Sequence, residues 1–158
     1  MTGILQAGSI TPGHLAIWGT NGVIRDGGTL FGASRVLASQ LGANFNDTGD
    51  QPILLPTNVT AFQLTGILVT NSAVNLTAAV GGFYPAASKA GTPLVAASQV
   101  YSSLTGATKL LACTLEAAVA TTRYSLTNLA DWAIYLSLTT AQGQAATGDV
   151  YVLGVDLT

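Results

Sequence analysis

The sequence predicts an all-β protein, namely an antiparallel, jelly-roll-like β-sandwich preceded by an extended N-terminal arm. From residue 51 onward, short runs rich in Val, Ile, Leu, Thr, Tyr and Phe are separated by Gly, Pro, Asn and Ser. The turn signals recur about every 8–12 residues, a spacing typical of sandwiches and barrels. Residues 1–50 instead contain turn-forming dipeptides such as Pro-Gly and Asn-Gly every few residues, and few apolar residues that could form a core. The chain of 158 residues is also long enough for a stable core.

Residues 1–50 are predicted to be an arm, extended apart from one short helix. The Asn21-Gly22 pair, flanked by apolar residues, favours a tight hairpin. Apolar residues spaced three or four apart over 29–41 predict the helix, and Gly42 suits its C-cap. Because so few apolar residues cannot form a core, we expect the arm to become ordered against a partner or a neighbouring subunit.

Residues 51–158 are predicted to form the sandwich domain. Its expected strands are 53–55, 61–71, 73–80, 94–101, 109–115, 121–126, 132–139 and 149–157. The segment 111–120 is also compatible with a short helix. Strand 132–139 alternates clearly, with one apolar face made by Trp132, Ile134, Leu136 and Leu138. Strand 149–157 is apolar on both faces, which predicts burial between sheets or under another subunit.

The composition excludes several classes of function. The chain is 49% hydrophobic and only 8% charged, against about 25% charged in an average soluble protein. Its five Lys and Arg residues are scattered, so a nucleic-acid surface is not expected. No apolar run reaches the roughly 18 residues of a membrane span. The N-terminal sequence lacks the pattern of a secretory signal, so synthesis in a cytosol is expected.

The residues suited to catalysis or metal binding are few and isolated. His14 is the only histidine and lies in the arm, where no positioned partner for acid–base chemistry is expected. Cys113, the only cysteine, lies in an apolar stretch and is predicted to be core. Asp47 and Asp50 form an oxygen-rich group that suits a polar hinge better than a calcium site. We therefore predict no enzymatic activity, no cofactor and no metal.

A loop and several short motifs remain as candidates for binding. Phe83 and Tyr84 are expected in a Gly- and Pro-rich loop over one end of the sandwich. The arm contains T-P-G-H at 11–14, then Trp18, then D-G-G at 26–28. These motifs resemble those of small virion proteins of tailed bacteriophages, as do the later segments GANFNDTGDQPI, GGFYPAASKAGTPLVAASQVYSSLTG and LSLTTAQG. Such proteins decorate heads or form fibre and spike parts, and many are trimeric.

The resemblance implies a capsid decoration (cement) protein that oligomerises on the phage head and attaches through its arm. The implied partners are further copies of the chain, as a homotrimer, and the major capsid protein or another virion protein. The implied location is the virion, after synthesis in the host cytoplasm, with no role for nucleic acid or membrane. The expected attachment residues are His14, Ile17, Trp18, Val23 and Ile24. The alternatives are a tail fibre, spike or baseplate component with a receptor- or glycan-binding domain, and a free carbohydrate-binding sandwich.

Overall fold

The computed structural model describes residues 5–6, 16–18, 23–26 and 33–158. By their contacts, the residues of the chain divide into two compact units, Met1–Ala33 and Ser34–Thr158. In the first unit, β1 (Leu5–Gln6), β2 (Ala16–Trp18) and β3 (Val23–Asp26) form a small sheet in the order β1-β3-β2. Strand β3 is antiparallel to β2 and parallel to β1.

The second unit is built on a large antiparallel sheet. Its strands are β4 (Ser34–Asn44), β11 (Thr147–Asp156), β6 (Ala61–Thr70) and β8 (Leu110–Ala112), in that order. A further short strand, β9 (Arg123–Ser125), pairs with the beginning of β6. Strand β4 follows the long strand β11 with two irregularities in the register. One lies at Gly42, whose φ of +67° is the left-handed conformation that glycine adopts most easily.

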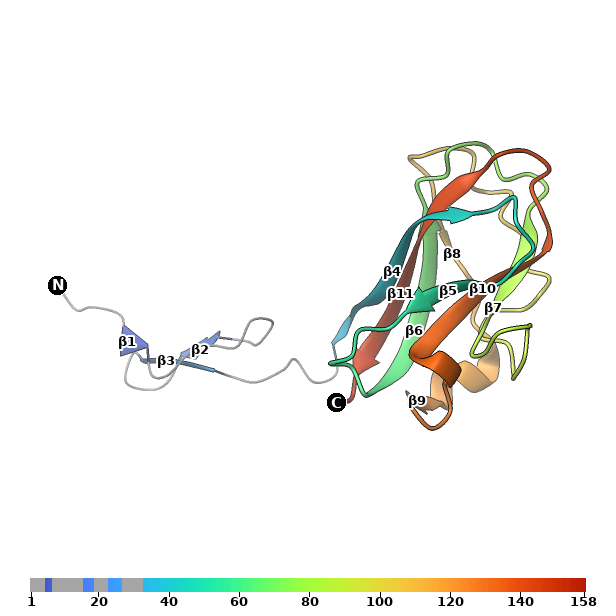
Figure 1. The fold of residues 1–158 in the computed structure, drawn as a ribbon. Helices are drawn as coiled ribbons and strands as arrows, with labels where there is room; N and C mark the ends of the chain where they lie inside the picture. The colour runs from blue at the N-terminus through green and yellow to red at the C-terminus, as the bar shows by residue number, and fades with distance from the viewer. Residues whose placement is uncertain (1–4, 7–15, 19–22, 27–32) are drawn as a thin grey trace. The chain divides into compact units, whose positions relative to one another are not determined.

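A smaller antiparallel sheet lies across the core from the larger one (Figure 1). It contains β5 (Gln51–Leu54), β10 (Ala133–Thr140) and β7 (Val80–Tyr84), in the order β5-β10-β7. The short 3-10 helices η1 (Ala117–Thr121) and η2 (Ala130–Trp132) flank β9 in the chain. In the described part of the chain, no helix is long and apolar enough to cross a membrane.

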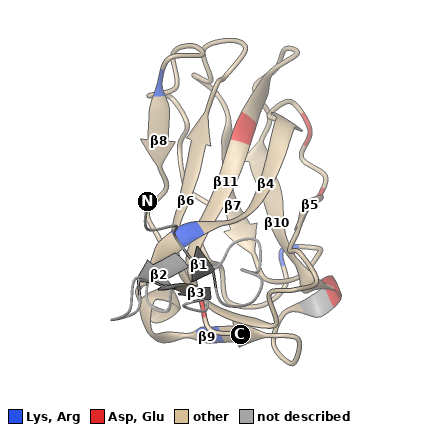
Figure 2. Cartoon of the chain, turned by 90° about the vertical axis from the view of Figure 1, so that its left-hand side faces the viewer, with Lys and Arg blue, Asp and Glu red and all other residues tan. Residues whose placement is uncertain are grey.

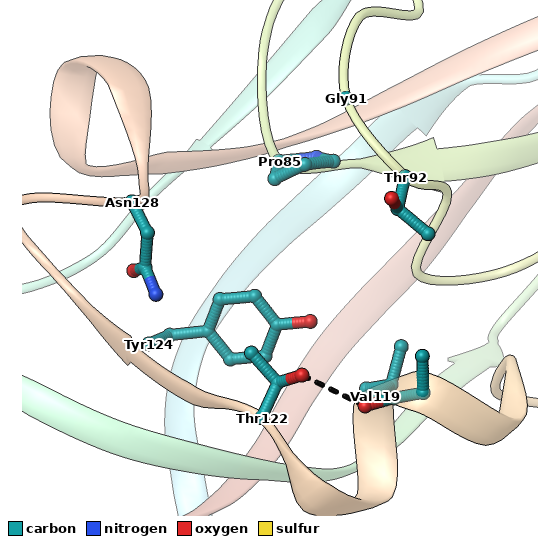
Figure 3. Close-up of a pocket in the computed structure, with 8 residues that line it drawn as sticks. Pro85, Gly91, Thr92, Val119, Thr122, Tyr124 and Asn128 are labelled. Carbon is teal, nitrogen blue, oxygen red and sulfur yellow. Dashed lines mark hydrogen bonds between the residues drawn. The ribbon is translucent and has the colours of Figure 1, made fainter.

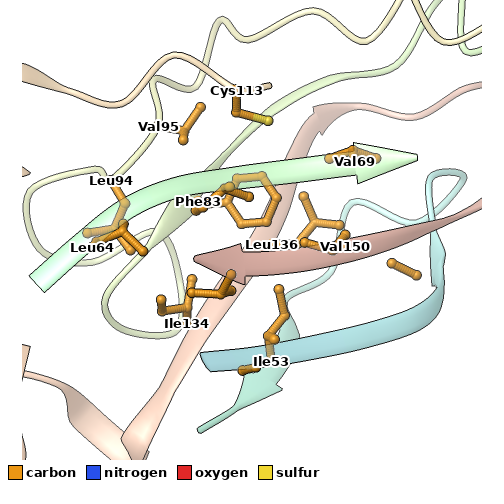
Figure 4. Packing of buried hydrophobic residues seen from close by; sticks show 14 of the residues in the cluster. Ile53, Leu64, Val69, Phe83, Leu94, Val95, Cys113, Ile134, Leu136 and Val150 are labelled. Carbon is orange, nitrogen blue, oxygen red and sulfur yellow. The ribbon is translucent and has the colours of Figure 1, made fainter. Parts of the chain in front are cut away.

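The inner faces of the two sheets enclose one hydrophobic core (Figure 4). Alternate residues of β6 and β11 face inward, and their side chains are fully buried, as expected for strands with one face on a core. The buried residues of the core include Phe45, Ile53, Leu64, Ile67, Val69, Phe83, Leu94, Leu136, Val150 and Val152. The predicted all-β sandwich is therefore confirmed, whereas the jelly-roll connectivity stays a prediction.

One side of the sandwich is closed by irregular segments. Val95 forms isolated bridges to Phe83 of β7 and to Leu115, and the Glu116 amide donates to the Leu94 carbonyl at 3.0 Å. Residues 110–116 begin beside β6 of the larger sheet and end beside Val95. This segment thus joins the edges of both sheets, so neither edge is left open there.

The structure corrects several of the predicted elements. The helix predicted over 29–41 is wrong from residue 34 on, because Ser34–Asn44 form strand β4; residues 29–32 lie outside the described residues. The compact sandwich unit starts at Ser34, so the boundary expected at residue 50 lies too far along the chain. Segments 73–79 and 94–101 contain no regular strand. The segment 111–120 combines the end of β8 with most of η1.

Strands β10 and β11 are buried differently from what their sequence patterns predict. Strand β10 alternates in sequence, yet every residue from 133 to 138 is buried, on both faces. Strand β11 is apolar on both faces, yet only alternate residues such as Val150 and Val152 are fully buried. Small side chains on β10 allow other parts of the chain to cover it, a possibility that hydrophobic alternation alone does not show.

Candidate functional site

The predicted attachment residues fall in the first unit. Ile17 and Trp18 belong to β2, and Val23 and Ile24 belong to β3. The register pairs Trp18 with Ile24, so the antiparallel pairing expected around Asn21-Gly22 is confirmed. The turn itself, residues 19–22, and His14 lie outside the described residues. The structure thus brings four of the five predicted residues onto one two-stranded ladder.

Cys113 is buried in the core, as the sequence predicts. Its amide donates to the Ile67 carbonyl at 2.9 Å, which fixes it beside β6. Burial raises the pKa of the Cys113 thiol to about 12, so the thiolate that a nucleophile or metal ligand needs does not form near neutral pH.

The oxygen-rich segment around Asp47 and Asp50 is not a hinge between arm and domain. It lies within the sandwich unit, between β4 of one sheet and β5 of the other. The Asp47 carboxylate accepts the Gly49 amide at 2.8 Å, and the Asn46 side chain accepts the Gly143 amide at 2.8 Å. These oxygens hold the crossover between the sheets. In the described part of the chain, no three His, Cys, Asp or Glu side chains gather as metal ligands.

Asp50 also belongs to a polar cluster on the outer face of the smaller sheet, which sequence reasoning did not find. Its carboxylate accepts the Ser137 hydroxyl at 2.6 Å and the Ser88 amide. The hydrogen bond from Ser137 is the main cause of the lowered pKa of Asp50. Residues 50, 88 and 137 are far apart in sequence, so no local motif announces the cluster.

Two tyrosines complete this cluster. Tyr135 donates its hydroxyl to Asp131 at 2.8 Å, and this hydrogen bond, with burial, raises the pKa of the Tyr135 phenol. Tyr84 pairs with Tyr135 across the strands, and burial raises its pKa as well. The Asp50 carboxylate therefore stays ionised and the two phenols stay neutral near neutral pH. This arrangement fixes the smaller sheet and its covering loop, and it supplies no acid–base pair with pKa values near 7.

Phe83 and Tyr84 occupy different positions from those predicted. Both belong to strand β7 and not to a loop, and both are buried. Phe83 belongs to the core cluster, whereas Tyr84 is buried outside it. The Gly- and Pro-rich surroundings of the pair predict a loop, but Gly81 and Gly82 are strand residues that accept the close approach of neighbouring backbone.

A pocket of about 270 Å³ opens at one end of the sandwich (Figure 3). Its lining comes from the loop after β7, from η1, and from β9 with the turn that follows: Pro85, Gly91, Thr92, Ala118, Val119, Thr122, Tyr124 and Asn128. Tyr124 stacks on Phe62 with ring centroids 5.4 Å apart, and burial raises the pKa of its phenol. The Asn128 side chain is engaged with the Ser125 amide and the Arg123 carbonyl.

The lining of this pocket limits its chemistry. It contains hydroxyl, amide and apolar groups and no carboxylate, amine, imidazole or thiol. A second pocket of about 330 Å³ has Glu116 as its single charged residue. Neither lining combines a nucleophile with a positioned base, and the groups of the first pocket can hydrogen-bond to and pack against small neutral molecules.

Comparison of the chain with protein families, curated proteins and solved structures gave no match.

Proposed function

We propose that the chain is a non-enzymatic structural protein of a phage virion, a decoration protein that oligomerises on the head and attaches through its N-terminal unit. The observation that carries the proposal is the division into two units. One is a well-packed sandwich; the other contains the ladder with Ile17, Trp18, Val23 and Ile24. A separate small β-unit beside a packed domain suits a protein that holds a neighbour with one part and exposes the other.

The chemistry of the sandwich supports a structural role. Most of its described carboxylates accept hydrogen bonds from loops and strands, as at Asp50 and Asp149, and its thiol is buried. The low overall charge suits a subunit packed into a symmetric assembly, where repulsion between copies need not maintain solubility. The resemblance of the arm motifs to small virion proteins points in the same direction.

The attachment role is tested with Trp18→Ala. Aromatic anchors concentrate binding energy, and truncating one typically costs about 2 kcal/mol of binding free energy or more. We expect the variant to be lost from assembled particles, as measured by quantitative mass spectrometry, while the melting temperature of the purified protein is unchanged. Trp18→Phe, which keeps an aromatic ring, is the matched control and should be retained. Normal incorporation of Trp18→Ala together with a large drop in melting temperature would contradict the anchor role.

A fibre or spike component that binds a receptor glycan is the second candidate function. The pocket beside Tyr124 favours it, because a lining of hydroxyl and amide groups suits a neutral sugar. Ala118 is exposed on η1 at the pocket, so Ala118→Trp should fill the space without disturbing the core. Titration with neutral monosaccharides, followed by NMR, should show shifts at Thr92 and Asn128 that this variant abolishes. No shift in the unmodified protein would remove this candidate.

A further inference from the structure

The larger sheet has an outer face that the described part of the sandwich does not cover. The cross-strand register defines it: Leu153 of β11 pairs with Val36 of β4 and Gly66 of β6. One step along, Tyr151 pairs with Leu68, which in turn pairs with Ala112 of β8. Partners opposite each other in a sheet share a face. We call this surface the β11 face; its apolar members are Val36, Leu68, Leu110, Ala112, Tyr151, Leu153 and Val155.

The burial pattern shows that the β11 face is separate from the core. Val150 and Val152, which point inward, are fully buried, whereas Tyr151, Leu153 and Val155 are half-buried. At the two sides of the face, Val36 is 49% exposed and Leu110 is 59% exposed. An antiparallel sheet with one solvated face normally alternates apolar and polar residues. Here three successive outward positions of β11, Tyr151, Leu153 and Val155, are apolar, although the flanking strands also carry polar outward residues such as Ser39, Gln63 and Thr70. An apolar central row of this kind is the pattern of a face that another surface covers.

The β11 face is also nearly free of charge. Figure 2 looks at the larger sheet with β8, β6, β11 and β4 side by side, and most of the ribbon carries no charged residue. Asp149 lies at one end, where it accepts the Gly42 amide at 2.8 Å and the Asn71 side-chain amide at 2.9 Å. At the other end, Arg35 and Asp156 form an ion pair with no net charge. Two such faces can therefore meet without bringing unpaired like charges into their centre.

The size of the face matches a subunit contact. Strands β4, β11 and β6 have ten or eleven residues each and β8 has three, so at about 4.8 Å between strands and roughly 3.3 Å per residue they span on the order of 540 Å². A standard protein interface buries about 800 Å² on each partner, so the face and its rim are large enough. Two sheets pack face to face about 10 Å apart with their side chains interdigitated.

We infer that a second copy of this chain packs on the β11 face. The inference rests on the proposed function in one respect, since it places the contact of the proposed oligomer. Self-association fits a wide face whose centre carries no charge, because identical faces present each other there with apolar side chains, while Asp149 and the exposed Arg123 lie at its two ends. A strongly charged partner would find no complementary groups at the centre.

The test is the mass of the full-length protein by size-exclusion chromatography with light scattering over a range of concentrations. We expect a multiple of 16.0 kDa for the unmodified chain. Leu153→Lys places a charge at the centre of the face, and Val36→Glu places one at a side chain that is already half exposed. Both variants should elute at the mass of one chain. The Val36→Glu variant should also melt as a single folded chain, because the substituted side chain is outside the core. Leu126→Glu is the matched control, since Leu126 is 63% exposed outside the β11 face, and it should assemble normally.

The outcomes separate this inference from the proposed function. A monomeric unmodified chain overturns the inference, whether the face is bare or covered by residues 1–33 of the same chain. Assembly of both charged variants at the normal mass overturns it as well. Particle incorporation of a chain that is monomeric in solution would leave the virion role standing without this contact. A normal oligomer in solution that is absent from particles would leave the contact standing without the virion role.

Discussion

The two sheets of the sandwich differ in what lies on their outer faces. On the smaller sheet, Ala133, Tyr135 and Ser137 are buried although they point away from the core. There the Asp50 carboxylate accepts the Ser137 hydroxyl and also the amide of Ser88, in the loop after β7, so it joins the sheet to this loop. On the larger sheet, the outward residues of β11 are apolar and only half-buried. Within the described sandwich, the smaller sheet is therefore covered on both faces and the larger sheet on its inner face only.

This difference shows why apolar content alone does not identify an interface. The covered face consists of small and polar residues, which the backbone of the loop can approach closely. In sequence, strand β10 therefore looks as if only one of its faces were buried. The β11 face is apolar, so its strand looks fully buried, although nothing in the described sandwich covers it. An interface is indicated when an apolar face is exposed in a chain that covers a more polar face.

The largest expected effect comes from Gly82→Ala, which attacks the covered face. A Cβ atom at Gly82 would lie 2.3 Å from the Val95 carbonyl oxygen and 2.9 Å from the Ala96 carbonyl carbon. Both are backbone atoms of the segment that borders β7 through the bridge between Phe83 and Val95, so this segment has to move. Overpacking of this kind costs up to about 3 kcal/mol of unfolding free energy. Chemical denaturation should show that loss, and a variant as stable as the unmodified protein would contradict the close covering of this face.

Removing the hydrogen bond that anchors the cover should have a smaller effect. Ser137→Ala deletes the hydroxyl that Asp50 accepts at 2.6 Å, in a side chain with no exposed surface. Asp50 itself keeps the Ser88 amide and partial contact with water, so we expect a loss of about 1 kcal/mol in unfolding free energy. Ser102→Ala, at an exposed turn position outside the β11 face, is the control and should change stability little. Equal losses in the two variants would show that the Asp50 bond does not anchor the cover.

Acid should weaken the covered face through Asp50. Its pKa is lowered from the ordinary value of 3.8, chiefly by the Ser137 hydrogen bond, so the folded state binds the proton less readily than the unfolded state. The resulting stability is present above pH 3.8 and is lost as the pH falls through the lowered pKa. Thermal melts on both sides of this range should show a smaller acid-induced drop for Asp50→Asn than for the unmodified protein. Equal drops would mean that other carboxylates dominate.

Part of this architecture can be predicted from sequence, and the reason differs from element to element. Strands β6, β10 and β11 are predicted nearly to their ends, because each has eight or more residues of consistent pattern. Strand β4 is missed because residues 34–41 satisfy a helical spacing as well as a strand on the edge of a sheet. Pairing with β11, a contact distant in sequence, decides between the two.

The candidate sites follow the same division between local and distant signals. The ladder that pairs Trp18 with Ile24 lies within ten residues of chain, so the turn pair between its strands predicts it. The Asp50 cluster and the pocket beside Tyr124 join segments that are more than thirty residues apart. No spacing rule covers such distances. The apolar outward positions of β11 are visible in sequence, but which of its two faces is the inner one depends on the fold.

The smallest expected effect is that of Gly66→Ala, the counterpart of Gly82→Ala on the larger sheet. A Cβ atom at Gly66 would meet only the Leu153 side chain, at 3.6 Å from its Cδ1 atom, which is an ordinary contact. Glycine inside a strand is less favourable than alanine by roughly 0.5–1 kcal/mol, so the variant should be slightly more stable. The comparison is made in the Val36→Glu background, where assembly is not expected to contribute to the melting temperature. If Gly66→Ala were as damaging there as Gly82→Ala, another part of the same chain would have to lie against the β11 face, and the difference between the two sheets would disappear.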